Sequence, residues 1–381
     1  MRIAIIGGGI GGLTAALALR RAGFEPEVFE QAPALLEVGA AIAVWPNAMR
    51  VLARLGVAGA VIERAGRLEE ARWLNRDGKL FNRIALPVRD APAVALHRAD
   101  LQGALLRALP PGSVHLGRRF GGFELGPDGV RALFADGAPV SCEVLICADG
   151  LHSRAREQLL GDGPPVYRGY ATWRGVAAVE HAALAPHAAT EVYGRGSRFG
   201  IGPVGLGRTG WWATFNEPAE AAEAPHEHRR KLLGLFGDWC APVPELIEAT
   251  PDENTLRNVT CDRPPARRWG EGRVTLLGDA AHPVTPNLGQ GGCLAIEDAA
   301  ILARCLTKYA DAAQALRSYE AHRRARAARI GRYSSLYGEI GQWQGRAAAR
   351  LRGSLLSAIP ESVGHRLLRL IFDYDADAVE V

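Results

Sequence analysis

The sequence has little of several features that would indicate a function at once. No segment approaches the ~18 to 20 uninterrupted apolar residues of a membrane span, which argues against stable insertion into a bilayer. The net charge is only +4, from 45 basic and 41 acidic residues, which is too small to indicate a nucleic-acid partner. Lysine is nearly absent, because Lys79, Lys231 and Lys308 are the only three and arginine supplies the other 42 basic residues. A cluster of arginines therefore carries less meaning here than usual.

The six cysteines also lack a functional pattern. They include no C-x-x-C pair and no nearby histidine at zinc-site spacing, so we expect no metal site. We interpret them as reduced thiols of a cytoplasmic protein. The apolar stretch 3–19 is interrupted by glycines, and Arg20 and Arg21 follow where a cleavage site should be. We therefore expect no secretory signal.

Glycine, in contrast, is abundant. It supplies 45 of 381 residues, about 12% against a usual ~7%. The hydrophobic content of 48% and the charged content of 23% are typical of a soluble globular protein. The length predicts two domains, or one large domain with a second one embedded in it.

The first glycine cluster lies between a predicted strand and a predicted helix. Residues 2–6 form a short β-branched run, residues 7–12 read GGGIGG, and residues 13–21 have helical character. This order of strand, turn and helix is typical of a dinucleotide-binding fold, in which the phosphates lie at the helix N-terminus.

The glycines of this turn have distinct expected roles. Gly7 allows a tight turn, Gly9 lets a pyrophosphate approach the backbone, and Gly12 lets helix and strand pack closely. Residues 25–30 read as a second strand that ends in Glu30, 18 residues after Gly12. In this fold, a carboxylate about this many residues after the glycine turn accepts hydrogen bonds from ribose hydroxyls and repels a 2′-phosphate. We therefore expect FAD or NAD as ligand, with a glycine-rich turn of an ordinary α/β protein as the alternative.

The middle of the chain does not continue as a regular βαβ series. Strand patterns dominate there, and aromatic residues concentrate between 171 and 215. We expect strands at 68–73, 79–84, 119–124, 130–134, 140–146 and across 171–215, and helices at 48–55, 98–109 and from 290 onward. Turns are expected at 77–78, 127–129 and 136–137. The pattern indicates a sheet inserted between pieces of a dinucleotide-binding fold.

A second glycine cluster comes late in the chain. Residues 273–277 form a β-run that ends in Gly278-Asp279, and a loop at 283–292 precedes a predicted helix. A strand that delivers an acid into a glycine-rich loop before a helix is another anion-facing helix N-terminus. We infer that one dinucleotide is held from two distant parts of the chain.

With these residues, the sequence resembles the single-component FAD-dependent monooxygenases with the p-hydroxybenzoate hydroxylase fold. The matching motifs are residues 7–12 with Glu30, Ala148-Asp149-Gly150 after a strand, and Gly278-Asp279 with the loop 286–292. Their order over most of the chain makes the resemblance specific.

The motifs of the individual branches of this family disagree. Residues 38–47 look like the urate hydroxylase branch, whereas residues 286–293 are similar to zeaxanthin epoxidases and alkylquinolone hydroxylases. The substrate cannot be assigned from these motifs.

The resemblance implies an α/β fold with a discontinuous Rossmann-like FAD-binding domain, an inserted β-sheet substrate domain and C-terminal helices. We expect the FAD-binding domain to comprise 1–72, 96–165 and 270–310, the substrate domain 73–95 and 166–269, and the C-terminal helical region 311–381.

The resemblance also implies which residues contact FAD. For the adenosine half these are Gly7, Gly9, Gly11, Gly12, Glu30, Gln31 and, through its backbone, Phe120. For the flavin half they are Arg98, Asp279, Leu288, Gly289, Gln290, Gly291 and Gly292, and Ala43 is a further expected cofactor contact. Gly11 or Gly12 would lie against the pyrophosphate, and Asp279 would bind the ribityl chain. Backbone N–H groups of the loop would face the flavin pyrimidine edge, where the helix dipole stabilises negative charge.

Two of the implied roles have a simpler alternative that does not depend on the resemblance. Arg98 would lie near the pyrophosphate and ribityl region, but it also reads as an exposed arginine at a helix start. Asp149 belongs to a motif linked to FAD and NAD(P)H, and we expect it to hold nearby backbone. A simple turn cap is the alternative for Asp149.

The substrate residues are expected mainly on the inserted sheet. Arg198 matches an active-site arginine of the urate hydroxylase branch and could pair with an anionic substrate; a surface strand arginine is the alternative. That branch has a tyrosine where this chain has Trp211-Trp212, which favours a flatter, more apolar ring than a purine, unless the two indoles belong to the core. His282 is a candidate proton relay, or a loop histidine bonded to backbone. Pro286 fixes the backbone beside the flavin.

The function implied is an FAD-dependent monooxygenase that uses NAD(P)H and O2 to hydroxylate an aromatic or heteroaromatic small molecule through a flavin C4a-hydroperoxide. A single G-x-G-x-x-G motif means that NADH or NADPH has no Rossmann domain of its own and docks transiently. The alternatives are a flavin-dependent epoxidase or other FAD oxidoreductase and, from another class, a flavin-binding regulatory protein without turnover.

The C-terminal region is expected to be helical. Residues 346–372 carry leucines and isoleucines interrupted by Pro360. We expect this segment to pack on the body of the protein or on a partner subunit in a monomer or homodimer, and not to insert into lipid. The arginine-rich segment 317–332 reads as a solvated helix, with a membrane or nucleic-acid patch as the alternative.

Overall fold

The computed structural model describes residues 1–35, 40–88, 90–135, 137–179, 181–221 and 224–381. Residues 38 and 39 of the urate-hydroxylase-like stretch and residue 136 of an expected turn lie outside the described residues.

A mostly parallel sheet brings the two glycine clusters together. Its strand order is β18 (Gly270–Glu271), β19 (Val274–Leu276), β12 (Val144–Cys147), β1 (Arg2–Ile6), β2 (Glu25–Phe29) and β8 (Val114–His115). Only the β18–β19 pair is antiparallel. The apolar β1, β12 and β19 are almost fully buried, as expected for parallel strands covered on both faces. Strands from the two ends of the sequence therefore share one sheet.

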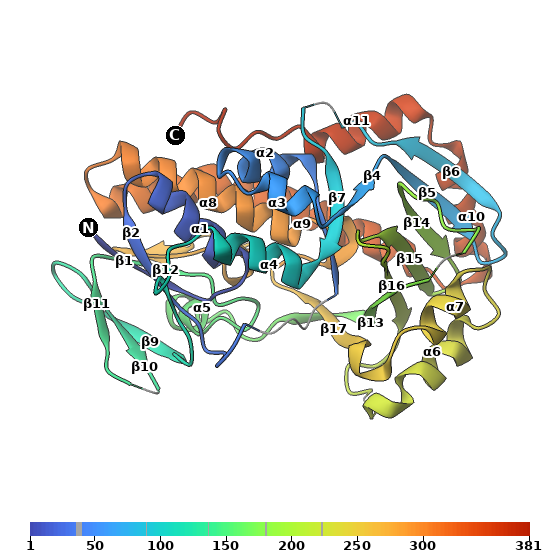
Figure 1. Ribbon diagram of the computed structural model, residues 1–381, viewed down its shortest axis with the longest axis horizontal. Coiled ribbons are helices and arrows are strands. Elements are labelled where there is room, and N and C mark those ends of the chain that lie inside the picture. The colour runs from blue at the N-terminus through green and yellow to red at the C-terminus, as the bar shows by residue number, and fades with distance from the viewer. Residues whose placement is uncertain (36–39, 89, 136, 180, 222–223) are drawn as a thin grey trace.

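Helices cover one face of this sheet and a small sheet covers the other (Figure 1). The helices are α1 (Ile10–Arg21), α4 (Arg98–Arg107), α8 (Gly291–Lys308) and, along α8, the long α9 (Ala312–Gly341). The small sheet has the order β11 (Val140–Cys142), β10 (Val130–Phe134) and β9 (Phe120–Leu125), and α5 (Arg154–Leu160) packs on β9. The expected strand at 140–146 is thus two strands, because its alternating start pairs with β10 and its apolar end joins the parallel sheet.

The inserted sheet runs in the order β17 (Leu256–Asp262), β13 (Val166–Ala177), β16 (Thr209–Asn216), β15 (Ser197–Pro203), β14 (Ala188–Tyr193), β5 (Glu70–Asn75) and β6 (Leu80–Ala85). Neighbours are antiparallel except β14 and β5. Helices α6 (His228–Phe236) and α7 (Val243–Glu248) bury one face of it in an aromatic core. Strand β5 begins a few residues before the expected end of the first FAD-binding segment, and the domain limits otherwise stay a prediction.

The remaining elements link the two large sheets or close the chain. They are the sheet β3 (Ala41–Val44), β7 (Ala93–His97) and β4 (Gly66–Leu68), the helices α2 (Pro46–Arg54) and α3 (Ala58–Ile62), and the C-terminal α10 (Arg346–Ala358) and α11 (Glu361–Phe372). The expected C-terminal helix is therefore two helices, because Pro360 disfavours helical backbone at Ile359. Among the described residues, no helix is long and apolar enough to cross a membrane, and no cluster of His, Cys, Asp or Glu could hold a metal ion.

Candidate active site

The glycine turn after β1 is packed against backbone on two sides. Gly7 has a φ of +104°, and a Cβ there would lie 2.4 Å from the Ala148 carbonyl oxygen. A Cβ on Gly12 would lie 1.9 Å from the Gly7 carbonyl oxygen, which no rearrangement of a side chain could relieve. Both positions therefore require glycine, as the sequence predicts for a tight turn and a close helix–strand contact.

Gly9 differs from its neighbours because it is open. A Cβ there would have only the Arg98 Nη2 within 4 Å, at 4.0 Å, and its φ of −74° and ψ of −178° suit any residue. The first intrahelical bond of α1 runs from the Leu13 N–H to the Gly9 carbonyl, so the preceding N–H groups are free of the helix ladder. A backbone without side chains and with free donors suits a phosphate. Gly11, in contrast, packs on Leu277 and Ala295.

Glu30 reaches back from the end of β2 to this turn. Its carboxylate accepts hydrogen bonds from the Gly8 N–H at 2.6 Å and the Ala32 N–H at 2.9 Å. An acid held at the glycine turn has the position that the sequence predicts for a ribose ligand. Gln31 is exposed beside it, and Phe120 begins β9 with its ring buried. Contacts of these two residues with the adenosine half stay a prediction.

Asp279 marks the second end of the site. It lies in a short 3-10 turn (Gly278–Ala280) after β19, and its Oδ1 would be 3.6 Å from a Cβ on Gly291. Its side chain is solvent-exposed, yet protein crowds around it and burial raises the pKa of its carboxyl. Asp279 is therefore accessible to a ligand although protein groups surround it.

The start of α8 forms the wall next to Asp279. Gly289 has a φ of +60° and lies beside Ala43 and the Trp45 indole. The first intrahelical bond of α8 runs from the Leu294 N–H to the Gln290 carbonyl, which leaves the N–H groups of the first turn free of the ladder. An anion-facing N-terminus therefore stands where the sequence predicts it.

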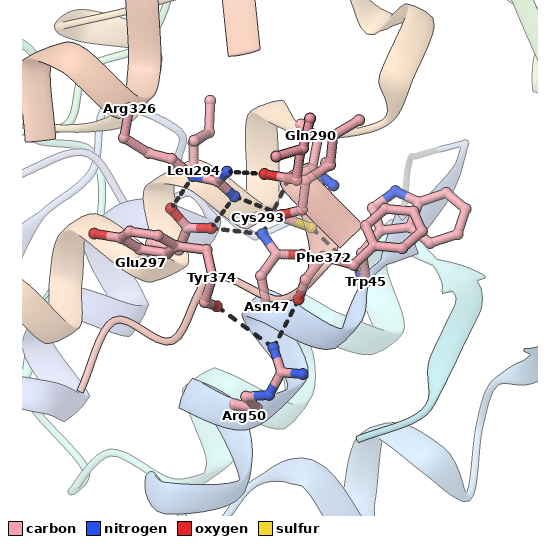
Figure 2. Close-up of polar contacts among 12 residues, drawn as sticks. Trp45, Asn47, Arg50, Gln290, Cys293, Leu294, Glu297, Arg326, Phe372 and Tyr374 are labelled. Atoms are coloured by element: carbon pink, nitrogen blue, oxygen red, sulfur yellow. Dashed lines mark hydrogen bonds and ion pairs between the residues drawn. The ribbon is translucent and has the colours of Figure 1, made fainter. Parts of the chain in front are cut away.

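Gln290 has a fully buried side chain that turns into the protein (Figure 2). Its Oε1 accepts a hydrogen bond from the Asn47 Nδ2 at 3.0 Å, and the same Nδ2 donates to Glu297 at 2.6 Å. Gln290 therefore anchors the loop from behind, and only its backbone can face a cofactor.

Two arginines interact electrostatically with each other, and one of them approaches the glycine turn. Arg98 approaches Gly9. Burial raises the pKa of Asp279, and the charges of His282 and Arg98 partly oppose this rise. Arg174, on β13, has its pKa lowered mainly by burial and further by the charge of Arg98. Among the described residues neither arginine forms an ion pair with a carboxylate, so a bound anion would relieve the repulsion between them. Arg174 was not predicted as a site residue, and nothing in its strand pattern marks it.

These features fit FAD. The open Gly9 backbone and the two arginines suit a pyrophosphate, Glu30 suits ribose hydroxyls, and Asp279 with the start of α8 suits the ribityl chain and an electron-rich ring edge. The free N–H groups at the starts of α1 and α8 come from distant parts of the sequence, and the two helices pack against each other.

Asp149 acts locally as a helix cap. Its Oδ1 accepts from the Ser153 hydroxyl at 2.6 Å and its Oδ2 from the Ala155 N–H at 3.3 Å at the start of α5. Burial raises the pKa of this carboxyl, and the two hydrogen bonds act against the rise. This geometry is compatible with the expectation that Asp149 holds nearby backbone, and its link to FAD and NAD(P)H stays a prediction.

Arg198 lies on β15 and is fully buried. Its guanidinium donates to Glu191 at 2.8 Å, to the Asn287 Oδ1 at 2.6 Å and to Gln342 at 3.2 Å. The expected pairing with an anionic substrate needs correction, because Glu191 already neutralises this charge. Arg198 instead ties the inserted sheet to the turn Pro286–Leu288 at the flavin loop. The sequence did not single out Asn287 or Glu191.

Only one of the two adjacent tryptophans can face the site. Trp211 is 1% exposed, donates to Thr250 at 2.8 Å and stacks on Phe199 in the core under α6 and α7. Trp212 points to the opposite face, as strand residues must alternate, and its ring centre is 5.3 Å from the Arg198 Cζ. The expected substrate role of Trp211 is therefore corrected to a core role.

His282 and Pro286 occupy different surroundings. His282 is buried with its Nε2 2.6 Å from the Asp298 Oδ2, and its Nδ1 has no partner among the described residues. Its neighbour is thus a buried carboxylate and not backbone, and the proton relay stays a prediction. Pro286 is exposed at the start of its turn, and its role over the flavin also stays a prediction.

Comparisons with known proteins agree with this site. The family described as FAD binding domain matches residues 1–334. The aurachin C monooxygenase/isomerase of Stigmatella aurantiaca is 42% identical over 362 residues, which cover 93% of this chain and 94% of that protein. The FAD-dependent urate hydroxylase of Klebsiella pneumoniae is 37% identical over 333 residues, which cover 85% and 86%. The crystal structure of Klebsiella pneumoniae HpxO complexed with FAD and uric acid has a TM-score of 0.90 at 33% identity and covers 98% of this chain and 96% of that chain.

The family match spans most of the sequence, and these relatives match over nearly their full length. The fold, the glycine turn with Glu30 and the second motif at Asp279 all agree with that match. The chain therefore belongs to the FAD binding domain family and is an FAD-dependent monooxygenase of the aromatic hydroxylase type.

Proposed function

We propose that this monooxygenase hydroxylates a planar heteroaromatic ring that is less polar than a purine and carries no carboxylate. The proposal rests on one observation, the neutral Arg198–Glu191 pair beside the Trp212 ring. A carboxylate substrate would need a free cation there, and Glu191 removes it. The indole face of Trp212 instead offers stacking to a flat ring. Among the relatives, the urate hydroxylases act on a purine, which lies outside this class.

The reaction consumes one O2 and one NAD(P)H for each substrate, giving hydroxylated product, NAD(P)+ and water, with one proton taken up. Bound FAD supplies the redox chemistry, accepting hydride from NAD(P)H and activating O2. The protein binds and orients the substrate and excludes water from the site. In this proposal the first turn of α8 would stabilise negative charge on the bound flavin, and the turn Pro286–Leu288 before it would help to hold the flavin.

The direct test is NAD(P)H consumption by the purified holoenzyme with a panel of ring systems. We expect quinolones and other uncharged bicyclic heteroaromatics to stimulate oxidation with a hydroxylated product. Salicylate and other benzoates should stimulate it far less. A preference for carboxylated rings, or for uric acid over every less polar ring, would contradict the proposed substrate class.

Trp212 is expected to contribute to substrate binding and not to stability. Trp212→Leu should raise KM roughly tenfold, because an aromatic stacking contact of about 1.4 kcal/mol is lost. The bound FAD and the free energy of unfolding should change little. The matched control is Trp211→Leu, which should leave a cavity in the aromatic core and cost about 3 kcal/mol of unfolding free energy. If Trp212→Leu left KM unchanged, the stacking role would be wrong.

Arg198 is expected to be a positioning residue that acts through Asn287. Arg198→Gln should lower the fraction of NAD(P)H that yields product at least severalfold while FAD stays bound, because Asn287 loses its charge-assisted donor. The variant also leaves Glu191 buried without its partner, so Arg198→Gln/Glu191→Gln should recover much of the lost stability. The amount of product formed per NAD(P)H separates the positioning role from the effect on stability, since the double variant should regain stability and stay uncoupled. Full coupling in either variant would contradict the positioning role.

A further inference from the structure

The two C-terminal helices expose a row of apolar side chains. Leu351 and Leu355 of α10 are 54% and 51% exposed, and Val363, Leu367 and Leu370 of α11 are 45%, 52% and 51% exposed. Spacings of four and three residues place each set on one side of its helix. We expected this segment to pack on the body of the protein, and only the side of each helix opposite these exposed residues does so.

Both helices rest on the same strand. Gly353 of α10 lies against the Phe81 ring and Gly364 of α11 against Ile84, both on β6, while the Asn82 Nδ2 donates to two carbonyls at the junction between the helices. The inner sides are thus fixed on β6, and the leucine-bearing sides face away from it. Figure 1 shows the pair at the outer end of the inserted sheet, far from β9 and β10.

A basic cleft runs along α10 beside these leucines. It has a volume of about 1560 Å³, and its lining includes six cationic side chains, Arg76, Lys79, Arg195, Arg346, Arg350 and Arg352, against one acidic residue, Asp77. Across the described residues, Lys79, Arg346 and Arg350 form no ion pair. The cleft therefore holds positive charge that the protein does not neutralise.

The helices carry the same sign of charge. Residues 346–372 contain five arginines and one acidic residue, Glu361. Arg366 and Arg369 lie exposed next to the leucines of α11, as Arg346 and Arg350 do on α10. A second copy of the chain docking here about a two-fold axis would bring these arginines close to their own counterparts, which costs energy. A negatively charged surface with an apolar interior would contact both the arginines and the exposed leucines without this repulsion.

We propose that α10 and α11, with the adjacent basic cleft, form a docking surface for an anionic phospholipid membrane. Leu351, Leu355, Val363, Leu367 and Leu370 enter the boundary between headgroups and acyl chains, as on interfacial amphipathic helices. The exposed arginines of both helices, Arg346, Arg350, Arg366 and Arg369, together with Lys79 contact the lipid phosphates. The enzyme lies on the membrane without crossing it, and its active site stays with the protein body.

The test is co-sedimentation of the holoenzyme with vesicles. We expect binding to vesicles of phosphatidylcholine mixed with phosphatidylglycerol at low salt, little binding to phosphatidylcholine alone, and a clear decrease at high salt. Arg346→Ala/Arg350→Ala should weaken binding about 30-fold, since each cation near the surface contributes roughly a fivefold factor. Leu351→Ser/Leu355→Ser/Leu367→Ser should weaken it at least about tenfold.

Matched controls come from the opposite end of the molecule. Leu116→Ser/Leu125→Ser and Arg107→Ala/Arg131→Ala change exposed residues of the same types and should bind like the unaltered protein. FAD absorbance and the melting temperature verify that each variant is folded. The proposal fails if the unaltered protein ignores anionic vesicles, or if the controls weaken binding as much as the C-terminal variants. It also fails if sedimentation velocity shows that the leucines hold a dimer that does not bind vesicles.

Discussion

Replacing Gly9 by valine should give a folded, colourless protein. The backbone at Gly9 is one that valine adopts readily, and a Cβ there meets only the end of one flexible arginine side chain. The branched side chain would, however, stand where the pyrophosphate approaches the free N–H groups of α1. We expect FAD affinity to fall about 100-fold or more, which corresponds to about 2.7 kcal/mol, and NAD(P)H oxidation to fall with it.

The matched control is Gly234→Val, on the exposed side of α6, where a Cβ meets nothing within 4 Å. It should bind FAD like the unaltered chain. Flavin absorbance after gel filtration and a titration with FAD give the affinities, and circular dichroism gives the folded fraction. An unaltered FAD affinity in Gly9→Val would mean that the cofactor does not approach this turn.

Replacing Arg323 by methionine should cost the protein roughly 3–5 kcal/mol of unfolding free energy, because it leaves buried carboxylates without their partner. Arg323 donates to Glu297 at 2.6 Å and to Asp298 at 2.7 Å, and all three side chains are fully buried. The same cluster reaches the flavin loop, since Glu297 also holds Asn47, which holds Gln290 (Figure 2). The variant should therefore bind FAD more weakly as well.

A control variant and a pH profile distinguish the loss of the ion pairs from an unspecific loss of stability. Arg329→Met, at an exposed arginine of the same helix, should change the unfolding free energy by less than about 0.5 kcal/mol. Burial would raise the pKa of Asp298, but His282 and Arg323 overcome this and lower it to about 2. The pairing therefore stabilises the fold fully above the unfolded pKa of about 4 and is lost as pH falls towards 2. Urea unfolding over this range should show a shallower pH dependence in Arg323→Met; an equally steep one would contradict the assignment.

The cofactor site could be predicted because its requirements are local. A positive φ at Gly7, a backbone contact at Gly12 and a strand that ends in Glu30 all leave a trace in residue type and spacing. The parallel sheet then brings the late motif at Asp279 to the same edge, as the order of strands, turns and helices implied.

The substrate face could be predicted only in part, because it depends on pairings between strands. Trp211 and Trp212 are adjacent, so the alternation of a strand already implied that only one could face the site, but not which one. The neutralisation of Arg198 by Glu191 depends on the β14–β15 register, which places Arg198 opposite Tyr193. Arg174 was not predicted because its position also depends on how its strand pairs within the sheet.

The C-terminal helices show a third limit. Their leucines were recognised, but an amphipathic pattern does not say which face the body covers when both sides carry apolar residues. Gly353 and Gly364 let the helices approach β6, and Leu368 and Ile371 also pack inward, whereas the leucines on the other side of each helix stay exposed.

The central claim, that one FAD held from both ends of the chain drives hydroxylation of an aromatic ring, is tested most directly by isotope labelling. The holoenzyme is supplied with NAD(P)H, a heteroaromatic substrate from the panel and 18O2, and the product is analysed by mass spectrometry. We predict one 18O atom per product molecule and none when the label is in water instead. Product labelled from water, or NAD(P)H oxidation that yields only hydrogen peroxide with every substrate, would contradict the claim.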